Sequence, residues 1–395
     1  MNVLYYLFSY PKLSESFVLN EIVELTEQGH NVAVFSIKDS GAEIKHDEYN
    51  QMDVPVHYAD IPSYSDVTDL ISRKTLSPRV VRRRLSELRH PRRMALQLHL
   101  GKQCSEYIED LDFDVDIIHG HFAILTKMGA VRAAAYHRIP CTVTCHAYDL
   151  YTDERYPPVL RSVDRIVTIS EYNRSYIEDK MGVSTPVNVV RAGIRPEKFE
   201  PSDGKVDRRI VTVARFSEKK GLEYAVDAVA EVAKNYPDVE YHMIGSGDRE
   251  EKIRTKIDEH GLEDTVKILG NVTDERLVKE LDEAEIFLLP CVVAENGDRD
   301  GIPVSLMEAM AMKTVPVSTR VSGIPELIDH RRNGMLAEPR NVTELVEMVE
   351  HILDRPEERR VMGRDAREKV EHKFNVHNET KKLVNVFKST SQKDS

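Results

Sequence analysis

The sequence predicts an α/β protein with two doubly wound domains of similar length. Short, continuous apolar segments recur along the chain, as expected of parallel strands that are buried on both faces. Segments with the apolar spacing of helices lie between them, and this alternation starts anew near residue 209. Two successive series of strands and helices therefore predict two open parallel sheets, each covered by helices, facing a central cleft.

In the first domain we expect strands at residues 3–8, 31–37, 115–119, 141–145, 165–169 and 187–190. Apolar spacing predicts one helix after Ser14 and others at residues 125–137 and 171–181. Ser14 is a favourable N-cap with Glu15 in the first turn, and Gly29 ends this helix. The Pro-, Ser- and Arg-rich residues that follow Tyr58 resemble an insertion.

In the second domain we expect strands at residues 210–214, 239–244, 265–269, 286–289 and 315–318, and helices at 222–235 and 250–260. Pro303 opens a further helix, since the N1 position tolerates a residue without an N–H group. Three charged helical stretches follow Asn341. We therefore expect the first domain at residues 1–195, a linker at 196–208 and the second domain at 209–370. Residues 371–395 form a last helix that returns to the first domain, and a polar tail.

The composition is that of a globular protein, with 41% apolar and 31% charged residues in a chain of 395. No stretch approaches the roughly 18 to 20 apolar residues of a membrane span, and the N-terminus lacks the basic segment and cleavage site of a signal peptide. We therefore expect a cytoplasmic protein. Four cysteines without a Cys-x-x-Cys pair favour neither a disulfide framework nor a metal site, so we expect no bound metal.

The formal net charge of −12 argues against a nucleic-acid partner, because phosphate backbones attract basic proteins. Residues 73–93 are basic, in contrast to the acidic net charge of the whole chain. They contain one acidic residue, Glu87, among nine basic ones: Arg73, Lys74, Arg79, Arg82, Arg83, Arg84, Arg89, Arg92 and Arg93. Such a segment can bind an anionic membrane surface peripherally, where each basic residue adds about 1 kcal/mol. A solvated helix face is the alternative interpretation.

The segment after the expected strand at residues 286–289 carries a candidate anion site. Asp300 and Gly301 lie in a polar loop before Pro303, and Glu308 lies inside the helix that follows. Glycine permits a close approach between backbone and ligand, and the N-terminus of a helix favours phosphate. Two acids that can bind hydroxyl groups, beside a helix start that can bind an anion, fit a sugar nucleotide.

The loop after the strand at residues 210–214 reads Arg215-Phe-Ser-Glu-Lys-Lys220. Ligands of open α/β sheets bind beyond the carboxyl ends of the strands, so we expect Arg215 and Lys220 to neutralise a diphosphate there. An ordinary charged turn is the alternative for this loop alone. The segment Gly245-Ser-Gly247 lacks the third glycine of a dinucleotide-binding fingerprint, so a tight turn is the better interpretation.

Two histidine motifs, His119-Gly-His121-Phe122 and Cys145-His146-Ala-Tyr-Asp149, end strands of the first domain. His119 and His121 are two residues apart, so a strand directs both to the same side. Histidines at strand ends are often structural hydrogen-bond partners, but these strand ends face the expected cleft. We therefore expect His146 and His121 to contact a ligand.

With these motifs assembled, the sequence resembles the retaining glycosyltransferases of family 4, also called glycosyl transferases group 1, and in particular their exopolysaccharide and colanic-acid-type members. The family motif Glu-x7-Glu has its counterpart in Asp300-x7-Glu308. The family's arginine and lysine for the donor diphosphate match Arg215 and Lys220, and its Gly-x-Pro-Glu segment matches Gly323-Ile-Pro-Glu326. The resemblance covers nearly the whole chain and implies the GT-B fold, with two Rossmann-like domains.

The resemblance also implies roles for single residues. Glu308 binds the ribose of the nucleotide, Asp300 binds hydroxyls of the transferred sugar, and His146 contacts that sugar near the reacting carbon. The backbone from Gly301 through Ile302 and Pro303 to Val304 binds the donor. The segment that includes Ser14 and Glu15 faces the acceptor, in the N-terminal domain. Asp300 is one methylene shorter than the usual glutamate, so its loop must come closer to the sugar.

The implied reaction is transfer of a hexose from a UDP- or GDP-linked donor to a glycan or lipid-linked acceptor, with retention at the anomeric carbon. Arg215, Lys220 and the helix start at Pro303 stabilise the charge on the departing diphosphate, so neither a metal nor a cofactor is expected. A sugar-nucleotide 2-epimerase of the same fold is one alternative. A non-catalytic partner subunit of a glycosyltransferase complex is another.

Overall fold

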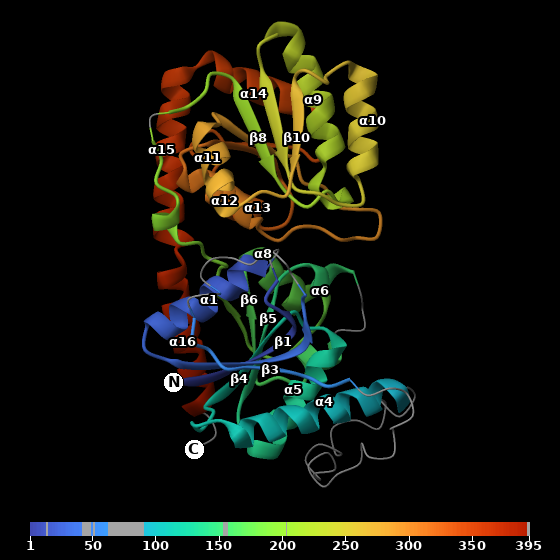
Figure 1. The fold of residues 1–395 in the computed structure, drawn as a ribbon, viewed down its shortest axis with the longest axis vertical. Helices are drawn as coiled ribbons and strands as arrows, with labels where there is room; N and C mark the ends of the chain where they lie inside the picture. Colours follow the sequence, from blue (N-terminus) through green and yellow to red (C-terminus); the bar gives the residue numbers. More distant parts are fainter. Residues whose placement is uncertain are drawn as a thin grey trace. The chain divides into compact units, whose positions relative to one another are not determined.

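The structure, a computed structural model, describes residues 1–12, 15–41, 49, 52–61, 91–152, 157–202 and 204–392. The chain forms two compact units, which Figure 1 colours along the sequence. Unit 1 comprises Met1–Val190 and Thr380–Ser395, and unit 2 comprises Arg191–Glu379. Residues 196–208, assigned to a linker from the sequence, therefore belong to unit 2 by their contacts.

Within the described residues of unit 1, seven parallel strands form one sheet in the order β3-β2-β1-β4-β5-β6-β7. The strands are β1 (Asn2–Tyr10), β2 (Asn31–Asp39), β3 (Val56–Tyr58), β4 (Ile117–His121), β5 (Cys141–Cys145), β6 (Arg165–Thr168) and β7 (Val187–Val189). The chain runs outward from β1 to β3 and returns to β4 on the other side of β1. This reversal between β1 and β4 is the point at which doubly wound sheets bind ligands.

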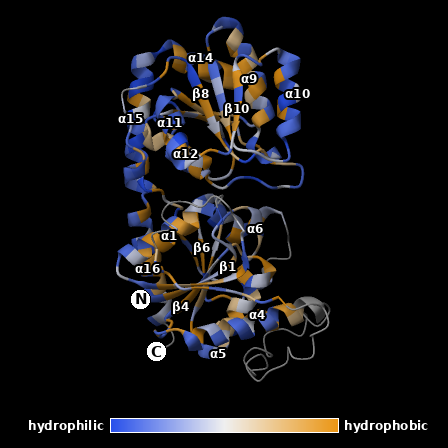
Figure 2. Cartoon of the chain, viewed as in Figure 1, coloured by the Kyte–Doolittle hydropathy of each residue, from blue (hydrophilic) through white to orange (hydrophobic). Residues whose placement is uncertain are grey.

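Alternate residues of β1 enter two apolar cores, one on each face of the sheet. Tyr5 packs in a core with Ile22 of α1 (Ser16–Glu27) and Phe387 of α16 (Val376–Ser391). Its neighbour Tyr6 packs in the other core with Leu100 of α4 (Pro91–Asp110). Figure 2 shows the apolar residues concentrated along the strands, as expected of a parallel sheet that is covered on both faces.

The other helical segments of unit 1 are η4 (Leu125–Lys127), α5 (Met128–His137), α6 (Tyr148–Tyr151), α7 (Pro157–Leu160), α8 (Glu171–Ser175) and the π-helix η5 (Tyr176–Lys180). The predicted helix at residues 171–181 thus divides into an α-helical and a π-helical part. Helix α4 was not predicted, although its Leu98, Leu100 and Cys104 are buried. From the sequence, this region was expected to belong to an insertion.

Within the described residues of unit 2, six parallel strands form a second sheet in the order β10-β9-β8-β11-β12-β13. They are β8 (Arg209–Val213), β9 (Glu240–Ile244), β10 (Val266–Gly270), β11 (Ile286–Leu289), β12 (Val315–Thr319) and β13 (Met335–Ala337). The order of this sheet reverses between β8 and β11. The loops after these two strands are those in which the sequence predicts the donor site.

The helical segments of unit 2 are η6 (Pro196–Lys198), η7 (Glu218–Lys220), α9 (Leu222–Asn235), α10 (Glu250–His260), α11 (Asp274–Glu283), α12 (Val304–Ala311), α13 (Ile324–Leu327), α14 (Val342–Asp354) and α15 (Pro356–Lys373). Strand β7 lies in unit 1 and joins η6 through residues 190–195. The predicted bounds of β11, α9 and α10 coincide with those of the structure. Strand β13 was not predicted.

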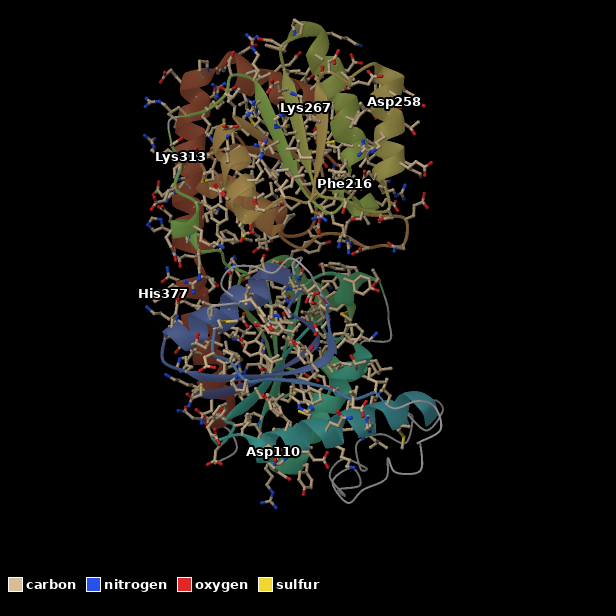
Figure 3. All side chains as sticks on the ribbon, in the orientation of Figure 1. Asp110, Phe216, Asp258, Lys267, Lys313 and His377 are labelled. Atoms are coloured by element: carbon tan, nitrogen blue, oxygen red, sulfur yellow. The ribbon has the colours of Figure 1, made fainter. Side chains whose placement is uncertain are left out.

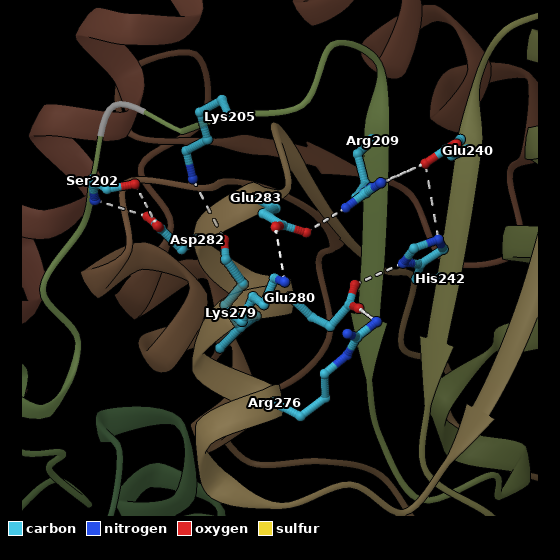
Figure 4. A network of polar contacts seen from close by, with 11 residues as sticks. Ser202, Lys205, Arg209, Glu240, His242, Arg276, Lys279, Glu280, Asp282 and Glu283 are labelled. Atoms are coloured by element: carbon cyan, nitrogen blue, oxygen red, sulfur yellow. Dashed lines mark hydrogen bonds and ion pairs between the residues drawn. The ribbon is translucent and has the colours of Figure 1, made fainter.

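A network of polar side chains joins α11 to the strands of unit 2 (Figure 4). Arg209 of β8 contacts Glu283 and, at 2.7 Å, Glu240 of β9. His242 Nδ1 lies 2.6 Å from Oε2 of the buried Glu280. These contacts offset part of the cost of burying charged groups between the helix and the sheet, although Nε2 of His242 and Oε1 of Glu280 have no hydrogen-bond partner among the described residues.

No described helix combines the length and the apolar character that a membrane crossing requires.

Candidate functional site

The loop after β8 gathers three cationic side chains at the carboxyl end of a central strand: Arg215, Lys219 and Lys220. The side chains of Lys219 and Lys220 are largely buried, at 11% and 13% exposure. Arg215 is exposed, and the described residues offer its guanidinium neither a hydrogen bond nor an ion pair. The loop therefore keeps one cation available for an anionic ligand.

Two of these cations hold Asp300 in place. Its Oδ2 lies 2.8 Å from Lys220 Nζ, and its Oδ1 lies 3.6 Å from Lys219 Nζ. The thiol of Cys291 donates to Oδ2 at 3.4 Å. Burial alone would raise the pKa of this carboxyl, but Lys220, Lys219 and the side-chain hydrogen bonds lower it to about 2. Asp300 is therefore a buried carboxylate that stays ionised at neutral pH.

Lys220 is stabilised as a cation in return. Burial opposes its charge, but the carboxylate of Asp300 outweighs this effect and raises the pKa of Lys220 above its ordinary value. Lys219 has a second partner, since its Nζ also lies 3.2 Å from Asp298 Oδ1. The structure thus brings together Lys220 and Asp300, two residues whose predicted roles are to bind the diphosphate and the sugar.

Helix α12 begins at Val304, one residue later than predicted, because Pro303 is the N-cap with φ −62° and ψ 128°. Gly301, Ile302 and Pro303 are buried directly before it. The N–H groups of a first helical turn have no partners within the helix, so this end of α12 offers donors to an anion. Glu308 lies on the second turn of α12 and is partly exposed.

Two glycines allow the loops at the end of the unit 2 sheet to pack against one another. Gly221 has φ +65°, and a Cβ atom there would lie 2.0 Å from the carbonyl oxygen of Pro290. Gly245 has φ +125°, and a Cβ atom there would lie 1.9 Å from the carbonyl oxygen of Ala214. Phe216, labelled in Figure 3, is fully buried in the same loop region. The predicted turn lies at residues 247–250, where the N–H of Glu250 donates to the carbonyl of Gly247 at 3.2 Å.

In unit 1, buried polar side chains lie at the carboxyl ends of β4 and β5. His121 ends β4, and His146 directly follows β5. The Nδ1 atom of His121 lies 3.0 Å from Nε2 of His146, and its Nε2 lies 3.1 Å from Oε1 of Glu21. His119 lies on the same side of the sheet, with its Nε2 3.8 Å from the same Glu21 oxygen, as the two-residue spacing predicts.

The histidines of this cluster are neutral at physiological pH. Burial lowers the pKa of His119 and of His121 to about 3, and it lowers the pKa of His146 well below its ordinary value. The nearby ammonium of Lys127 lowers the pKa of His121 further. Each neutral imidazole has one nitrogen that donates and one that accepts.

Two phenylalanines pack against the ring of His146. The ring centroid of Phe17 lies 4.5 Å from that of His146, and the centroid of Phe122 lies 4.6 Å from it. Phe122 follows His121 with φ 64°, a left-handed backbone conformation that costs a residue other than glycine roughly 1 to 3 kcal/mol. Such strain is typical of functional sites, and here it sets the position of a ring that contacts His146.

Asp149 joins the backbones behind the two strand ends. Its Oδ1 accepts the N–H of His146 at 3.0 Å, and its Oδ2 accepts the N–H of Ala123 at 2.8 Å. Burial raises the pKa of Asp149, and the backbone hydrogen bonds oppose this rise only in part. The side chain of Asn173 donates to the carbonyl of His146 as well. The backbone that carries His146 is therefore fixed on both sides.

Some predicted residues lie elsewhere or outside the described residues. Glu15 occupies the N-cap position of α1, not the first turn, and its carboxylate pairs with Lys12 at 2.5 Å. Ser14 lies outside the described residues. Residues 73–90 of the basic segment lie outside them too, and of residues 91–93 only the backbone in α4 is described.

Among the residues that contact the predicted site residues, no role was predicted from the sequence for Glu21, Asp149, Lys219 and Cys291. Glu21 lies in the amphipathic pattern of α1, where a charge is typical of a solvated helix face. Lys219 and Cys291 adjoin predicted site segments, but spacing alone does not show which neighbour turns toward Asp300. Asp149 follows His146 by three residues, a spacing that suits a side chain to accept the N–H of that histidine.

One group among the described residues has the composition of a metal site. The ligand atoms of Glu21, His119 and His121 lie within 4.8 Å of one another. However, Thr142 and Thr144 already bond to the two ring nitrogens of His119, at 2.8 and 3.0 Å. The charge of Lys127 also disfavours a second cation at His119 and His121. Hydrogen bonding within the protein therefore accounts for this group better than a metal does.

Comparison with known families assigns both units. A family model described as Glycosyltransferase Family 4 matches residues 14–198, and one described as Glycosyl transferases group 1 matches residues 194–369. The sequence is 30% identical to a putative colanic acid biosynthesis glycosyltransferase, WcaL of Escherichia coli K12, over 98% of this chain and 100% of the relative. It is 29% identical to the amylovoran biosynthesis glycosyltransferase AmsK of Erwinia amylovora, over 98% and 99% of the two chains.

Solved structures share the fold over the same length. HepE of Anabaena, crystallised in complex with UDP, has a TM-score of 0.76 at 16% identity, over 98% of this chain and 100% of HepE. A glycosyltransferase of Rickettsia africae has a TM-score of 0.75 at 15% identity, over 98% of each chain. This likeness confirms the predicted fold class.

Proposed function

The chain belongs to glycosyltransferase family 4, and on this basis we propose that it transfers a hexose from a UDP- or GDP-linked donor to a glycan or lipid-linked saccharide. The anomeric configuration is retained, and neither a metal nor a cofactor takes part. The relatives named for colanic acid and amylovoran biosynthesis support an acceptor of exopolysaccharide synthesis. The complex of HepE with UDP supports a nucleotide-linked donor.

The ion pair between Lys220 and Asp300 is the observation that supports this proposal most. It joins the loop after β8 to the segment before α12, so a residue suited to diphosphate lies 2.8 Å from a residue suited to sugar hydroxyls. An ionised carboxylate accepts hydrogen bonds from hydroxyls, and the pKa of about 2 keeps Asp300 in that form.

Cleavage of the bond between sugar and diphosphate places negative charge on the leaving diphosphate. Arg215, Lys220 and the first turn of α12 supply cations and N–H donors that stabilise this charge. The sugar passes through an oxocarbenium-like state while Asp300 holds its hydroxyls. The acceptor hydroxyl then attacks the anomeric carbon from the face that the diphosphate leaves, and its proton passes to the departing phosphate oxygen. Protein cations thereby take the place of a divalent metal.

The experiment is a transfer assay that measures nucleotide release and product formation from UDP-, GDP- and ADP-linked sugars in the presence of EDTA. Arg215→Ala should lower turnover by orders of magnitude, because an unpaired guanidinium is lost from the leaving-group site. Arg254→Ala is the matched control, since Arg254 pairs with Glu250 on the exposed side of α10. Wild-type rates in Arg215→Ala would overturn the proposal.

The same assay separates the alternatives. A transferase releases nucleotide only when an acceptor is present, whereas a 2-epimerase converts the sugar nucleotide without one. A non-catalytic partner subunit would bind nucleotide, seen as a rise in melting temperature, without releasing it. A ligand at a hundred times its dissociation constant adds about 2.7 kcal/mol of stability.

The basic residues at 73–93 support a peripheral contact with anionic membrane, where lipid-linked acceptors reside. Co-sedimentation with vesicles tests this contact. Binding to anionic vesicles that disappears at high salt is expected, and equal binding to neutral vesicles would refute the electrostatic explanation.

A further inference from the structure

The buried cluster of unit 1 contains a continuous row of side chains that leads from Glu21 through His121 to His146. The facing nitrogens of the two histidines are 3.0 Å apart, whereas the ring centroids are 5.2 Å apart and the ring planes differ by 20°. The rings therefore meet edge to edge, which suits an N–H···N hydrogen bond. Glu21 lies on helix α1, so the row connects a helix with the ends of two strands.

The carboxylate of Glu21 sets the direction of every hydrogen bond in this row. Burial raises the pKa of the Glu21 carboxyl, and the Tyr5 hydroxyl, which donates to its Oε1 at 2.6 Å, opposes that rise. In its ionised form Glu21 can only accept hydrogen bonds. Nε2 of His121, 3.1 Å from the same oxygen, must then carry a proton and donate. Because a neutral imidazole has one proton, Nδ1 of His121 accepts, and Nε2 of His146 must donate to it.

This leaves Nδ1 of His146 as an unprotonated acceptor. The described residues offer Nδ1 no hydrogen bond, although they bond the backbone N–H and carbonyl of the same residue. His146 follows the carboxyl end of β5, where open α/β sheets bind ligands. The two phenylalanine rings that contact His146 hold the plane of its imidazole.

We propose, building on the function proposed above, that Glu21 and His121 are positioning residues that fix the proton of His146 on Nε2 and present its Nδ1 as an acceptor to a substrate hydroxyl. Neither residue needs to touch the substrate. The role of His121 is then to orient His146, not to contact a ligand as the sequence suggested.

The direct test is nuclear magnetic resonance of protein labelled with ¹⁵N-histidine, which distinguishes protonated from unprotonated ring nitrogens. The resonances of His146 are identified by their absence in His146→Ala. We expect its proton on Nε2 in the wild type and a mixture of both tautomers in Glu21→Leu, which has no acceptor. A His146 protonated on Nδ1 in the wild type would overturn the proposal, as would a bound metal found by elemental analysis.

The kinetic test uses variants of the same position. Glu21→Leu should lower kcat roughly ten- to a hundredfold, the range seen when the partner behind a metal-bound histidine is removed, and leave the donor KM unchanged. Glu21→Gln keeps an oxygen that can accept from both Tyr5 and His121, so it should recover most of this loss. If Glu21 only stabilised the fold, variants with equal melting temperatures would have equal kcat values, and kcat would not fall from the wild type through Glu21→Gln to Glu21→Leu.

Two controls complete the design. Glu24→Leu removes another buried glutamate of α1, one that bonds to Gln28, and should leave kcat unchanged. In a His146→Ala background, Glu21→Leu should cause no further loss of kcat, because Glu21 acts on the reaction only through His146. A full additional loss there would overturn the proposal. If the wild type itself neither binds nucleotide nor transfers sugar, the proposed function fails, while the tautomer measurement still tests the hydrogen-bond row.

Discussion

Separating the buried pair of Lys220 and Asp300 should reveal a coupling free energy far above that of a surface ion pair. The pKa of Asp300 is about 2, against an ordinary value of 3.8. A pKa shift of one unit corresponds to about 1.4 kcal/mol, so the folded state favours the ionised form of Asp300 by about 2 kcal/mol relative to the unfolded chain. This value already includes the opposing effect of burial. We therefore expect a coupling energy of about 2 kcal/mol or more at pH 7.

The pH dependence follows from the sign of the same shift. Folding lowers the pKa of Asp300, so its contribution to stability is fully present above the unfolded value near pH 4. It is lost as the pH falls through the folded value of about 2. Above neutral pH the raised pKa of Lys220 keeps the pair charged until that ammonium loses its proton.

The assay compares Lys220→Met, Asp300→Asn and the double variant by hydrogen exchange of amides in β11 and α12, which reports the opening free energy of unit 2 alone. The control is the surface pair of Lys234 and Glu231, 2.6 Å apart, with side chains that are 66% and 51% exposed. Exposed pairs typically couple by roughly 0.2 to 1 kcal/mol. Equal coupling energies in the two pairs would refute the argument from burial.

Three further predictions concern single positions. Gly221→Ala should destabilise the protein by several kcal/mol more than Gly261→Ala in urea unfolding, because both glycines have φ +65° but only Gly221 would place its Cβ 2.0 Å from a carbonyl oxygen. Asp149→Asn should speed hydrogen exchange at residues 121–124 and cost about 1 to 3 kcal/mol, since one amide oxygen cannot serve two N–H groups from opposite sides; unchanged exchange would contradict this. Lys127, whose pKa burial lowers to about 7, should make the protein more stable as the pH rises from 7 to 10, because the unfolded chain binds the extra proton in this range. Lys127→Met should remove that rise in melting temperature.

Much of the fold could be predicted because most strands are continuous apolar runs between turn residues. The bounds of helices α9 and α10 were predicted correctly. Helix α9 ends at the polar Asn235, and helix α10 ends directly before Gly261, whose backbone is left-handed. Strand β13 could not be found, because three apolar residues carry no periodicity. Helix α4 was missed since its first turn continues the basic segment, so its buried residues did not stand out.

The candidate site could be predicted where a motif names its residues, as with Lys220 and Asp300. Partners contributed by another element could not be predicted, because their sequence surroundings are ordinary. Glu21 is such a case, since only the packing of α1 on the sheet brings it to the end of β4. Cys291 is another, because a cysteine after a buried strand is usually an apolar core residue.

The close packing at Gly221 has a consequence for protein engineering. The N–H of Val292 bonds to the carbonyl of Lys219 at 2.9 Å, and the N–H of Glu295 bonds to Glu218 at 3.0 Å. The loops after β8 and β11 therefore pack and hydrogen-bond against each other as one structural unit. Chimeras made to exchange donor preference with a relative should transplant residues 215–221 and 290–303 together. If only one of the two loops is exchanged, its backbone is expected to clash with the remaining loop, as a Cβ atom at residue 221 would with the carbonyl oxygen of Pro290.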